Sequence, residues 1–446
     1  MNNIIIMKSA GVFKNNLRRL TNPARCTLSQ QIRSYTCSNE NEHGVYTGKS
    51  QHKTSLFNSM KVTKPWNKGE NIASKQVVKP KFEEKRMIDS YTEVLLPFKT
   101  DSELLGQYEN FFGVLKVGKF IEDLDCMAAT IAYKHCNVDD VETAPFYLVT
   151  ASVDSLVLIK ELDINKNYRI FGNVNYVGFS SIEVMIKVEP YEEGEEDLAP
   201  RLAIESSDRP YNLLSTFTMV ALDKFTRKPS QVNPLKADNE LEKKVLKLGE
   251  ASKEKKKKLK STSLAKIPPT NEERLIIHDK YLESLKYKEN KPDNVKYMEQ
   301  TVLNSSLMCH PQNRNIYGFM FGGFLMREAL EHAWITAYMF CKENPTIVRA
   351  DEIVFKQSVP VGAILKFISK VIYSEGYPDN EFQVAVEAWV IGPDLSNMGI
   401  TDTFHYTFKS RTKQVPKVIP RTYEESIQLL EGKRRKDRRG QLPTEL

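Results

Sequence analysis

A segment of this chain occurs twice, and the repeat limits the possible folds more than any other feature does. Residues 118–133 read GKFIEDLDCMAATIAY, and residues 323–338 read GFLMREALEHAWITAY, a constant offset of 205 positions. The identical pairs are Gly118/Gly323, Ala128/Ala333, Ala132/Ala337 and Tyr133/Tyr338, and apolar residues face apolar residues at four further positions. A repeat of this length indicates one supersecondary unit used twice, with the two copies packed on each other.

Each copy predicts a long helix followed by four strands. The helices, residues 118–135 and 323–340, are apolar on nearly all faces and therefore need to be buried. The expected strands are 147–158, 168–177, 181–188 and 213–222 in the first copy, and 346–355, 363–373, 381–390 and 401–409 in the second. Because strands and helices do not alternate, a parallel doubly wound sheet is unfavourable. A sheet that curls around its helix solves the burial problem, so we expect an α+β double hotdog fold.

An acidic residue in one copy of the repeat has an apolar counterpart in the other: Asp125 in the first copy corresponds to Leu330 in the second. Asp125 lies two helical turns beyond Gly118, on the same helix face. A carboxylate in an otherwise apolar helix is costly to bury, so its presence needs a reason. We interpret Asp125 as a catalytic carboxylate that activates water. The neighbouring Glu122 and Asp123 are explained by favourable interaction with the helix N-terminus.

The second helix opens with the glycine-rich run GFMFGG, which ends at Gly322 and Gly323. Adjacent glycines at a helix start permit close backbone approach and leave free N–H groups. Together with the helix dipole, such groups can polarise a carbonyl oxygen in a transition state. Close packing of the helix against the sheet is the alternative explanation. Gly322 and Gly323 are therefore candidate site residues.

Several other classes of site are disfavoured. The six cysteines form no CxxC pair, so we expect no metal site and a reducing compartment. The sequence lacks GxSxG, GxGxxG and P-loop motifs, and we expect no bound cofactor. No apolar run approaches the roughly 18 residues of a membrane span.

The N-terminal segment has the composition of a targeting peptide. Residues 1–39 contain six Lys or Arg and no Asp or Glu, and they open with an apolar and basic run. We expect residues 1–35 to be a mitochondrial transit peptide and residues 36–84 to be a flexible lead-in; a disordered basic tail is the alternative. Removing the six cations reduces the net charge from +7 to +1 (7 − 6), so the basic charge is weak evidence for nucleic-acid binding.

Residues 227–294 separate the two units and are dense in lysine, with the run Lys253–Lys260 at their centre. No aromatic residue occurs between Phe225 and Tyr281, although single-strand binding surfaces use aromatic stacking. A solvated linker with helical pieces is therefore favoured over a nucleic-acid surface. The first hotdog domain is expected at 85–226 and the second at 295–412. Residues 413–446 are expected to form a tail whose basic end is disordered.

Four segments carry a family resemblance: VGKFIEDLDCMA, HPQNRNIYG, FGGFLMREALEHAW and TFHYTF. In this order they resemble the mitochondrial acyl-CoA thioesterase 9 and 10 family, over roughly residues 85–430. The resemblance implies two hotdog domains, hydrolysis of acyl-CoA to free acid and CoA, and a location in the mitochondrial matrix.

The resemblance also implies a composite site. Related double hotdog thioesterases pair an Asp from the helix of one repeat with an Asn from the glycine loop of the other. Asp125 matches the Asp, and Asn315 is the Asn nearest to the glycine pair, with Asn313 as the alternative. Phe319 and Gly318 occupy the positions where a polar residue is often found, so the Asn would act only if the loop folds inward.

We therefore expect an acyl-CoA thioesterase with one competent site and acyl-CoA as its partner. We also expect a homo-oligomer, a dimer or trimer of chains, because such sheets leave exposed edge strands and helix-free outer faces for pairing. Two alternatives remain open at this point. One is a non-catalytic acyl-CoA-binding regulatory protein, and the other is an RNA-associated mitochondrial protein that uses the lysine run.

Overall fold

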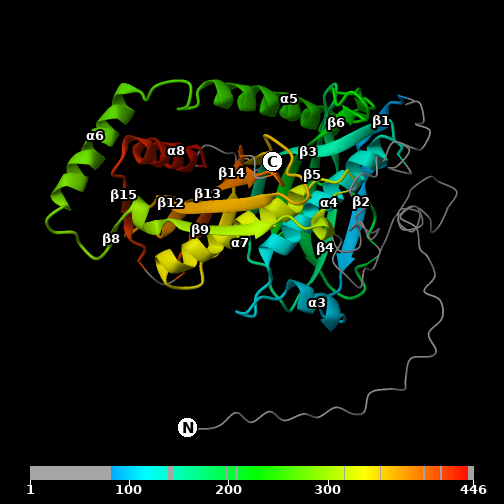
Figure 1. Cartoon of the computed structure of the whole chain (residues 1–446). Coiled ribbons are helices and arrows are strands. Elements are labelled where there is room, and N and C mark those ends of the chain that lie inside the picture. Colours follow the sequence, from blue (N-terminus) through cyan, green and yellow to red (C-terminus); the bar gives the residue numbers. More distant parts are fainter. Residues whose placement is uncertain are drawn as a thin grey trace, which may run out of the picture.

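The computed structural model describes residues 82–439, except 139–143, 197, 206–208, 316, 352, 395–396 and 412–413. The expected transit peptide, nearly all of the expected lead-in and the last residues of the tail lie outside this range. Its main feature is an 11-stranded antiparallel sheet with the order β2-β4-β5-β6-β3-β10-β14-β13-β12-β9, in which β11 also pairs with β3 (Figure 1).

The two halves of this sheet are built alike. The first half contains β2 (Thr92–Leu96), α4 (Val117–His135), β3 (Phe146–Leu158), β4 (Asn167–Val177), β5 (Ser181–Tyr191) and β6 (Leu213–Asp223). The second contains β9 (Leu303–Met308), α7 (Gly322–Cys341), β10 (Thr346–Ala350), β11 (Ile353–Val354), β12 (Ile364–Tyr373), β13 (Glu381–Ile391) and β14 (Asn397–Lys409). From one edge inward the order is β2-β4-β5-β6-β3, and from the other edge inward it is β9-β12-β13-β14-β10, which is the equivalent arrangement. The halves meet where β10 pairs with β3.

Each half encloses its long helix, as the hydrophobic pattern requires. The inner face of β5 contributes Val184 and Ile186, and that of β14 contributes Phe404 and Tyr406; all are buried in one core with α4 and α7. Full burial of a large apolar side chain contributes roughly 1.5–3 kcal/mol, so enclosing two apolar helices stabilises the curled sheet. The predicted α+β double hotdog fold is confirmed.

Shorter elements complete the fold around this sheet. Two parallel strand pairs form, β1 with β7 and β8 with β15. Their bounds and those of the remaining elements are β1 (Lys85–Arg86), η1 (Met87–Ser90), α3 (Ser102–Tyr108), β7 (Leu235–Lys236), α5 (Glu240–Ser261), α6 (Asn271–Lys286), β8 (Val295–Tyr297), η2 (Met298–Thr301), η3 (Pro311–Asn313), β15 (Lys417–Ile419) and α8 (Tyr423–Arg439). In the described part of the chain, no helix combines the length and apolar character needed to cross a membrane.

Two features of the sheet differ from the sequence-based prediction. Each helix is preceded by an edge strand, β2 or β9, that was not predicted. The residues of β9 are mostly exposed, so no alternation of apolar and polar residues marks it. The strand expected at 346–355 is divided into β10, which pairs with both β14 and β3, and β11, which pairs with β3 alone.

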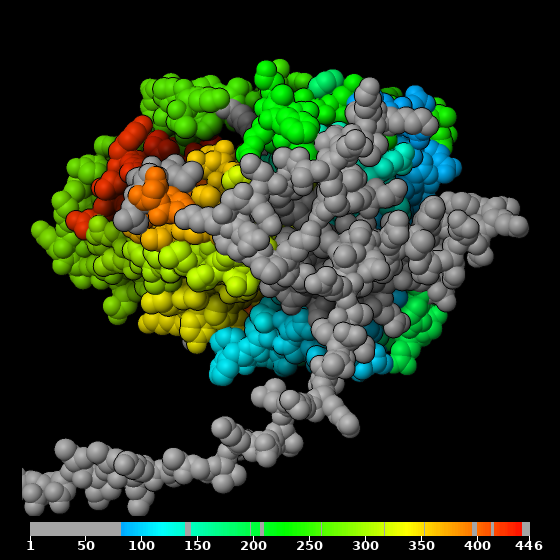
Figure 2. All heavy atoms as spheres, turned by 45° about the vertical axis from the view of Figure 1, so that its right-hand side comes forward, coloured from blue at the N-terminus to red at the C-terminus, as the bar shows by residue number. Residues whose placement is uncertain are grey.

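The outer faces of the sheet are not helix-free, and this part of the prediction was wrong. A Cβ atom on Gly249 of α5 would lie 2.7 Å from the Tyr176 side chain of β4, and one on Gly432 of α8 would lie 2.6 Å from Tyr373 Cβ of β12. Both helices therefore pack closely on the sheet. Figure 2 shows α8, in red, between the green α5–α6 segment and the strands of the second half.

The basic C-terminal segment is also helical rather than disordered. Its cations have partners that a solvated tail would lack: Arg434 Nε donates to Glu273 Oε1 of α6 at 2.6 Å, and Lys436 pairs with Asp379. These contacts hold α8 against the second half of the sheet and against α6.

Candidate active site

The site lies where the first turn of α7 meets the middle of α4. A Cβ atom on Gly323 would lie 2.9 Å from Glu122 Cα and 3.1 Å from Asp125 Cβ, and one on Gly322 would lie 3.1 Å from Asp125 Oδ2. Any side chain at position 323 would therefore push the two helices apart. The glycine pair is required for helix–helix contact, and it also brings its backbone N–H groups to Asp125.

Both oxygens of the Asp125 carboxylate are held by hydrogen bonds. The backbone N–H of Gly323 donates to Oδ2 at 2.6 Å, and the Thr150 hydroxyl of β3 donates to Oδ1 at 2.7 Å. Asp125 is only 1% exposed. One donor comes from each half of the chain, so the orientation of the carboxylate depends on both halves.

Burial raises the pKa of Asp125 to about 6. The hydrogen bonds from Thr150 and from the Gly323 amide oppose this rise, and the nearby charge of Glu122 adds to it. A carboxylate with this pKa is a stronger base than an exposed one and is still mostly ionised at neutral pH. Such a group is suited to accept a proton from water.

An ion pair links equivalent positions of the two helices. Arg327 Nε donates to Glu122 Oε1 at 2.7 Å, and these residues are separated by the repeat offset (327 − 122 = 205). The other oxygen of Glu122 accepts from Lys119 Nζ at 2.5 Å, while Asp123 accepts from the hydroxyl of Tyr108. Glu122 and Asp123 thus have specific partners, in place of the general helix-dipole role expected from the sequence.

Asn315 shapes the loop that leads into α7. Its Oδ1 accepts hydrogen bonds from the backbone N–H of Tyr317 at 2.9 Å and of Phe319 at 3.1 Å. The contacts described for Asp125 are made by Thr150 and Gly323 rather than by Asn315. The structure brings three of the four expected site residues together, namely Asp125, Gly322 and Gly323. The catalytic partnership of Asn315 stays a prediction.

Thr150 is a site residue that sequence reasoning missed. A threonine within a strand is usual on grounds of β-propensity, so its type carries no signal. Tyr317, in the loop before α7, was also missed. The Tyr317 hydroxyl forms a hydrogen bond with Tyr133 Oη. Tyr133 Oη in turn accepts a hydrogen bond from Leu148 N at 3.1 Å. The ring centroid of Tyr317 lies 4.0 Å from that of Tyr147. These contacts anchor the glycine loop of the second half to the first half.

The described residues contain no group of three or more His, Cys, Asp or Glu side chains placed to hold a metal ion.

We expect Gly323→Ala to destabilise the protein by about 1–3 kcal/mol, the usual cost of overpacking, because the added methyl group meets backbone atoms of α4. The matched control is Gly106→Ala in α3, where nothing lies within 4 Å of the added atom; helix propensity there favours alanine. Thermal unfolding of both variants measures the difference, and equal stability would show that the helices do not need this glycine.

No family model matches the chain. Mitochondrial acyl-coenzyme A thioesterase 9 of Mus musculus is 36% identical over 369 residues, covering 81% of this chain and 79% of the relative. Mitochondrial acyl-coenzyme A thioesterase 10 of Mus musculus is 35% identical over 369 residues, with 81% and 79% covered. An acyl-CoA hydrolase structure from Staphylococcus aureus is 24% identical, covers 33% of this chain and 91% of its own, and has a TM-score of 0.31.

Proposed function

The chain belongs to the family of mitochondrial acyl-CoA thioesterases 9 and 10, and we propose that Asp125 is the general base of its reaction. As a member of this family, the protein is a mitochondrial enzyme that hydrolyses acyl-CoA thioesters to free carboxylic acid and CoA. One observation supports this role of Asp125. Its carboxylate is buried, its pKa is raised, and it accepts one hydrogen bond from each half of the chain.

The proposed reaction uses this carboxylate as its base. Asp125 accepts a proton from a water molecule, and the water oxygen forms a bond to the thioester carbon. The C–S bond of the resulting tetrahedral intermediate then breaks, and CoA leaves as a thiolate. The proton held by Asp125 passes to the thiolate, so the products are a carboxylic acid and CoA thiol and the carboxylate is regenerated.

The oxygen of the tetrahedral intermediate carries negative charge and needs a donor. Gly323 already donates its N–H to Asp125 at 2.6 Å, which favours Gly322 as the donor to this oxygen. The Gly322 amide lies at the N-terminus of α7, where the helix dipole stabilises negative charge. Removal of one such donor costs on the order of 10²-fold in kcat in other enzymes.

We expect Asp125→Asn to lower turnover by about 10²-fold or more, because the amide keeps the size of the side chain but cannot accept the proton. Thermal stability should be retained, since a neutral amide is easier to bury than a carboxylate. A thiol-release assay at matched folded concentration measures the effect. The control is Glu331→Gln, a half-exposed carboxylate on α7, and full activity of Asp125→Asn would rule out the general-base role.

The pH dependence of kcat/KM should report the same group. Activity requires ionised Asp125, so it should be present above the pKa of about 6 and fall as the pH drops through that value. The hydrogen bond from Thr150 stabilises the ionised form. Thr150→Val should therefore move the acidic limb to higher pH. An acidic limb at the same pH in Thr150→Val would show that Thr150 does not affect the pKa of Asp125.

We also propose that the enzyme acts in the mitochondrial matrix. The acid-free N-terminus with its six cations has the character of a matrix-targeting peptide. Mitochondria without their outer membrane can be treated with a protease. We expect the processed protein to be protected under these conditions, and its digestion would contradict the proposal.

A homo-oligomer, a dimer or trimer of chains, is our further proposal. The sheet ends at β2 and β9, and most residues of β9 are exposed. Exposed edges invite pairing, and closed symmetric assemblies are the usual outcome. Light scattering at micromolar concentration should give a multiple of the chain mass. A stable monomer would contradict the proposal.

A further inference from the structure

An aromatic patch lies on the outside of α7, next to the loop that leads into α4. Its six residues, of which Trp334 is half-buried and the others are exposed, are Phe111, Phe112, Trp334, Ile335, Tyr338 and Met339. The Phe111 side chain is 95% exposed and that of Met339 is 60% exposed. Figure 1 shows α7, and α3 which precedes this loop, on the lower side of the molecule, away from α5. A contiguous apolar patch on a protein surface usually marks an interaction site.

Contacts within the chain hold the patch in a defined shape. Asn110 Oδ1 accepts hydrogen bonds from Phe112 N at 2.9 Å and from Val114 N at 3.2 Å, which closes the loop before α4. The ring centroid of Phe112 lies 5.6 Å from that of Trp334 and 6.0 Å from that of Tyr338. An aromatic surface that is already ordered loses little conformational freedom on binding, which favours affinity.

The repeat shows that this part of α7 is more apolar than the fold requires. Three patch residues of α7 have smaller or polar counterparts on α4, 205 positions earlier, and the pairs are Trp334/Ala129, Ile335/Thr130 and Met339/Lys134. None of the three α4 residues is exposed, and Lys134 Nζ donates to the backbone oxygen of Tyr91 at 2.5 Å. The equivalent surface of α4 is therefore covered within the chain.

The loop residue Phe112 differs from its counterpart in the same way. Its equivalent in the repeat is Tyr317 (317 − 112 = 205), and the counterpart of Tyr338 is Tyr133. Tyr317 and Tyr133 join their hydroxyl groups in a hydrogen bond, whereas Phe112 has no hydroxyl group to offer Tyr338. The half that carries Asp125 thus uses this place for a polar contact within the chain, and the other half leaves an apolar surface open.

The patch is large enough to form the centre of an interface. Phe, Tyr and Trp side chains bury roughly 150–250 Å² each, so the exposed fractions of the five exposed side chains leave on the order of 500 Å² open. Two copies placed patch to patch would bury on the order of 1,000 Å² from these residues alone, close to the lower end of the roughly 1,200–2,000 Å² of stable interfaces.

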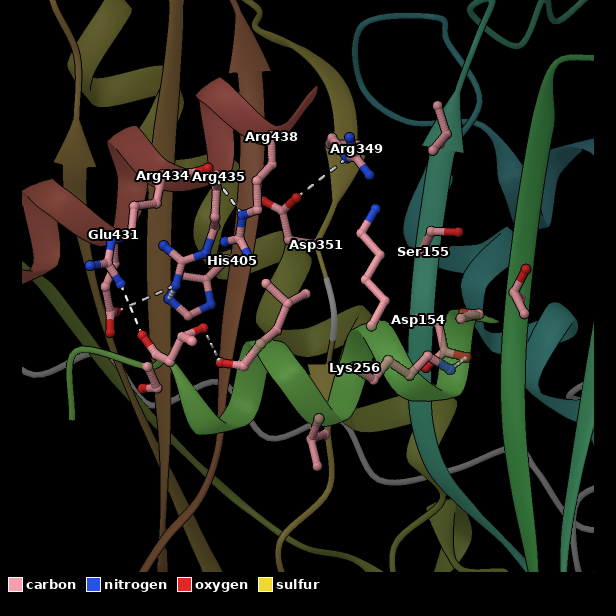
Figure 3. Close-up of a pocket in the computed structure, with 18 of the residues that line it drawn as sticks. Asp154, Ser155, Lys256, Arg349, Asp351, His405, Glu431, Arg434, Arg435 and Arg438 are labelled. Atoms are coloured by element: carbon pink, nitrogen blue, oxygen red, sulfur yellow. Dashed lines mark hydrogen bonds and ion pairs between the residues drawn. The ribbon is translucent and has the colours of Figure 1, made fainter. Parts of the chain in front are cut away.

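The opposite side of the sheet is covered and charged. There α5 and α8 lie over the strands, and Figure 3 shows charged side chains of both helices against the sheet. Lys256 Nζ of α5 lies 2.5 Å from Asp154 Oδ2, and Arg435 of α8 donates to His405 Nε2 at 2.9 Å. That side is therefore occupied within the chain, whereas the outer side of α7 is open.

The lack of charge in the patch favours a second copy of the chain as its partner. In a two-fold interface a surface meets itself, so any charged residue there comes close to like charges. An uncharged aromatic surface avoids this repulsion, and the interfaces of homodimers are more apolar than those of other complexes.

We propose that two copies of this chain pair through the aromatic patch about a two-fold axis. Each copy then buries its exposed Phe111 and Met339 side chains against the other. The inference rests on the homo-oligomer proposed above and names the surface that holds it together. It does not involve Asp125, so it stands apart from the catalytic mechanism.

Sedimentation velocity of the full chain and of Phe111→Glu/Met339→Glu at micromolar concentration tests the surface. The introduced carboxylates meet like charges across the axis, so the variant should have half the mass of the unchanged protein. Because both side chains are exposed, the fold should be retained. Thiol-release activity checks this, since Asp125 and its donors Thr150 and Gly323 belong to one chain.

The matched control is Phe179→Glu/Tyr423→Glu. These side chains are 68% and 67% exposed and lie outside the patch, so the variant adds the same charge at comparable apolar positions. It should have the mass of the unchanged protein. Equal dissociation of the control and of the patch variant would overturn the proposal.

A charge-swapped pair tests whether the patch meets itself. Phe111→Lys/Met339→Lys should also be dissociated when it is alone. An equimolar mixture of the Lys and Glu variants should associate again, because opposite charges then meet across the axis. Recovery of the associated mass would also show that both variants are folded.

The remaining outcomes separate this inference from the broader one. An oligomer whose mass is the same in the Glu variant would overturn the patch alone and leave the homo-oligomer standing, and so would a mixture that stays dissociated. A monomeric unchanged protein would overturn both. If that monomer floats with phosphatidylcholine vesicles, the patch serves a lipid surface instead of a second copy.

Discussion

The contact between α4 and α7 is the constraint on which the catalytic geometry depends. The two helices approach so closely that a Cβ atom at position 323 would lie 2.9 Å from Glu122 Cα. At this distance a backbone amide of one half reaches the carboxylate of the other half, which also accepts from Thr150 of the sheet. Both helices are held in place by a curled sheet that continues from one half into the other, so fold and site share one interface.

Much of the fold could be predicted from the sequence because burial leaves a periodic signal. The helices and the long strands alternate or cluster apolar residues, and the repeat relates the two halves. Elements without that signal were missed. None of the residues of the edge strand β9 is buried. The helix α8 is so rich in cations that it looks like a solvated tail, yet its charges are matched by Glu273 and Asp379 from elsewhere in the fold.

The site was predictable only in part, for a related reason. Asp125 stood out because it breaks an apolar pattern and because its counterpart in the repeat is Leu330. The glycine pair stood out through its unusual composition. Thr150 could not be found in this way, because its role comes from its register opposite α4 and not from its residue type.

The ion pair between Glu122 and Arg327 has a consequence for the origin of the two halves. These positions are equivalent in the repeat, so they face each other across the axis that relates the halves. A symmetric dimer formed from two copies of either half would place two like charges at this contact, and each charge would keep only the counterions of its own half. In a single chain the two equivalent positions can carry opposite charges, as Glu122 and Arg327 do. Each half has thereby become the complement of the other, and self-association of a single half is disfavoured.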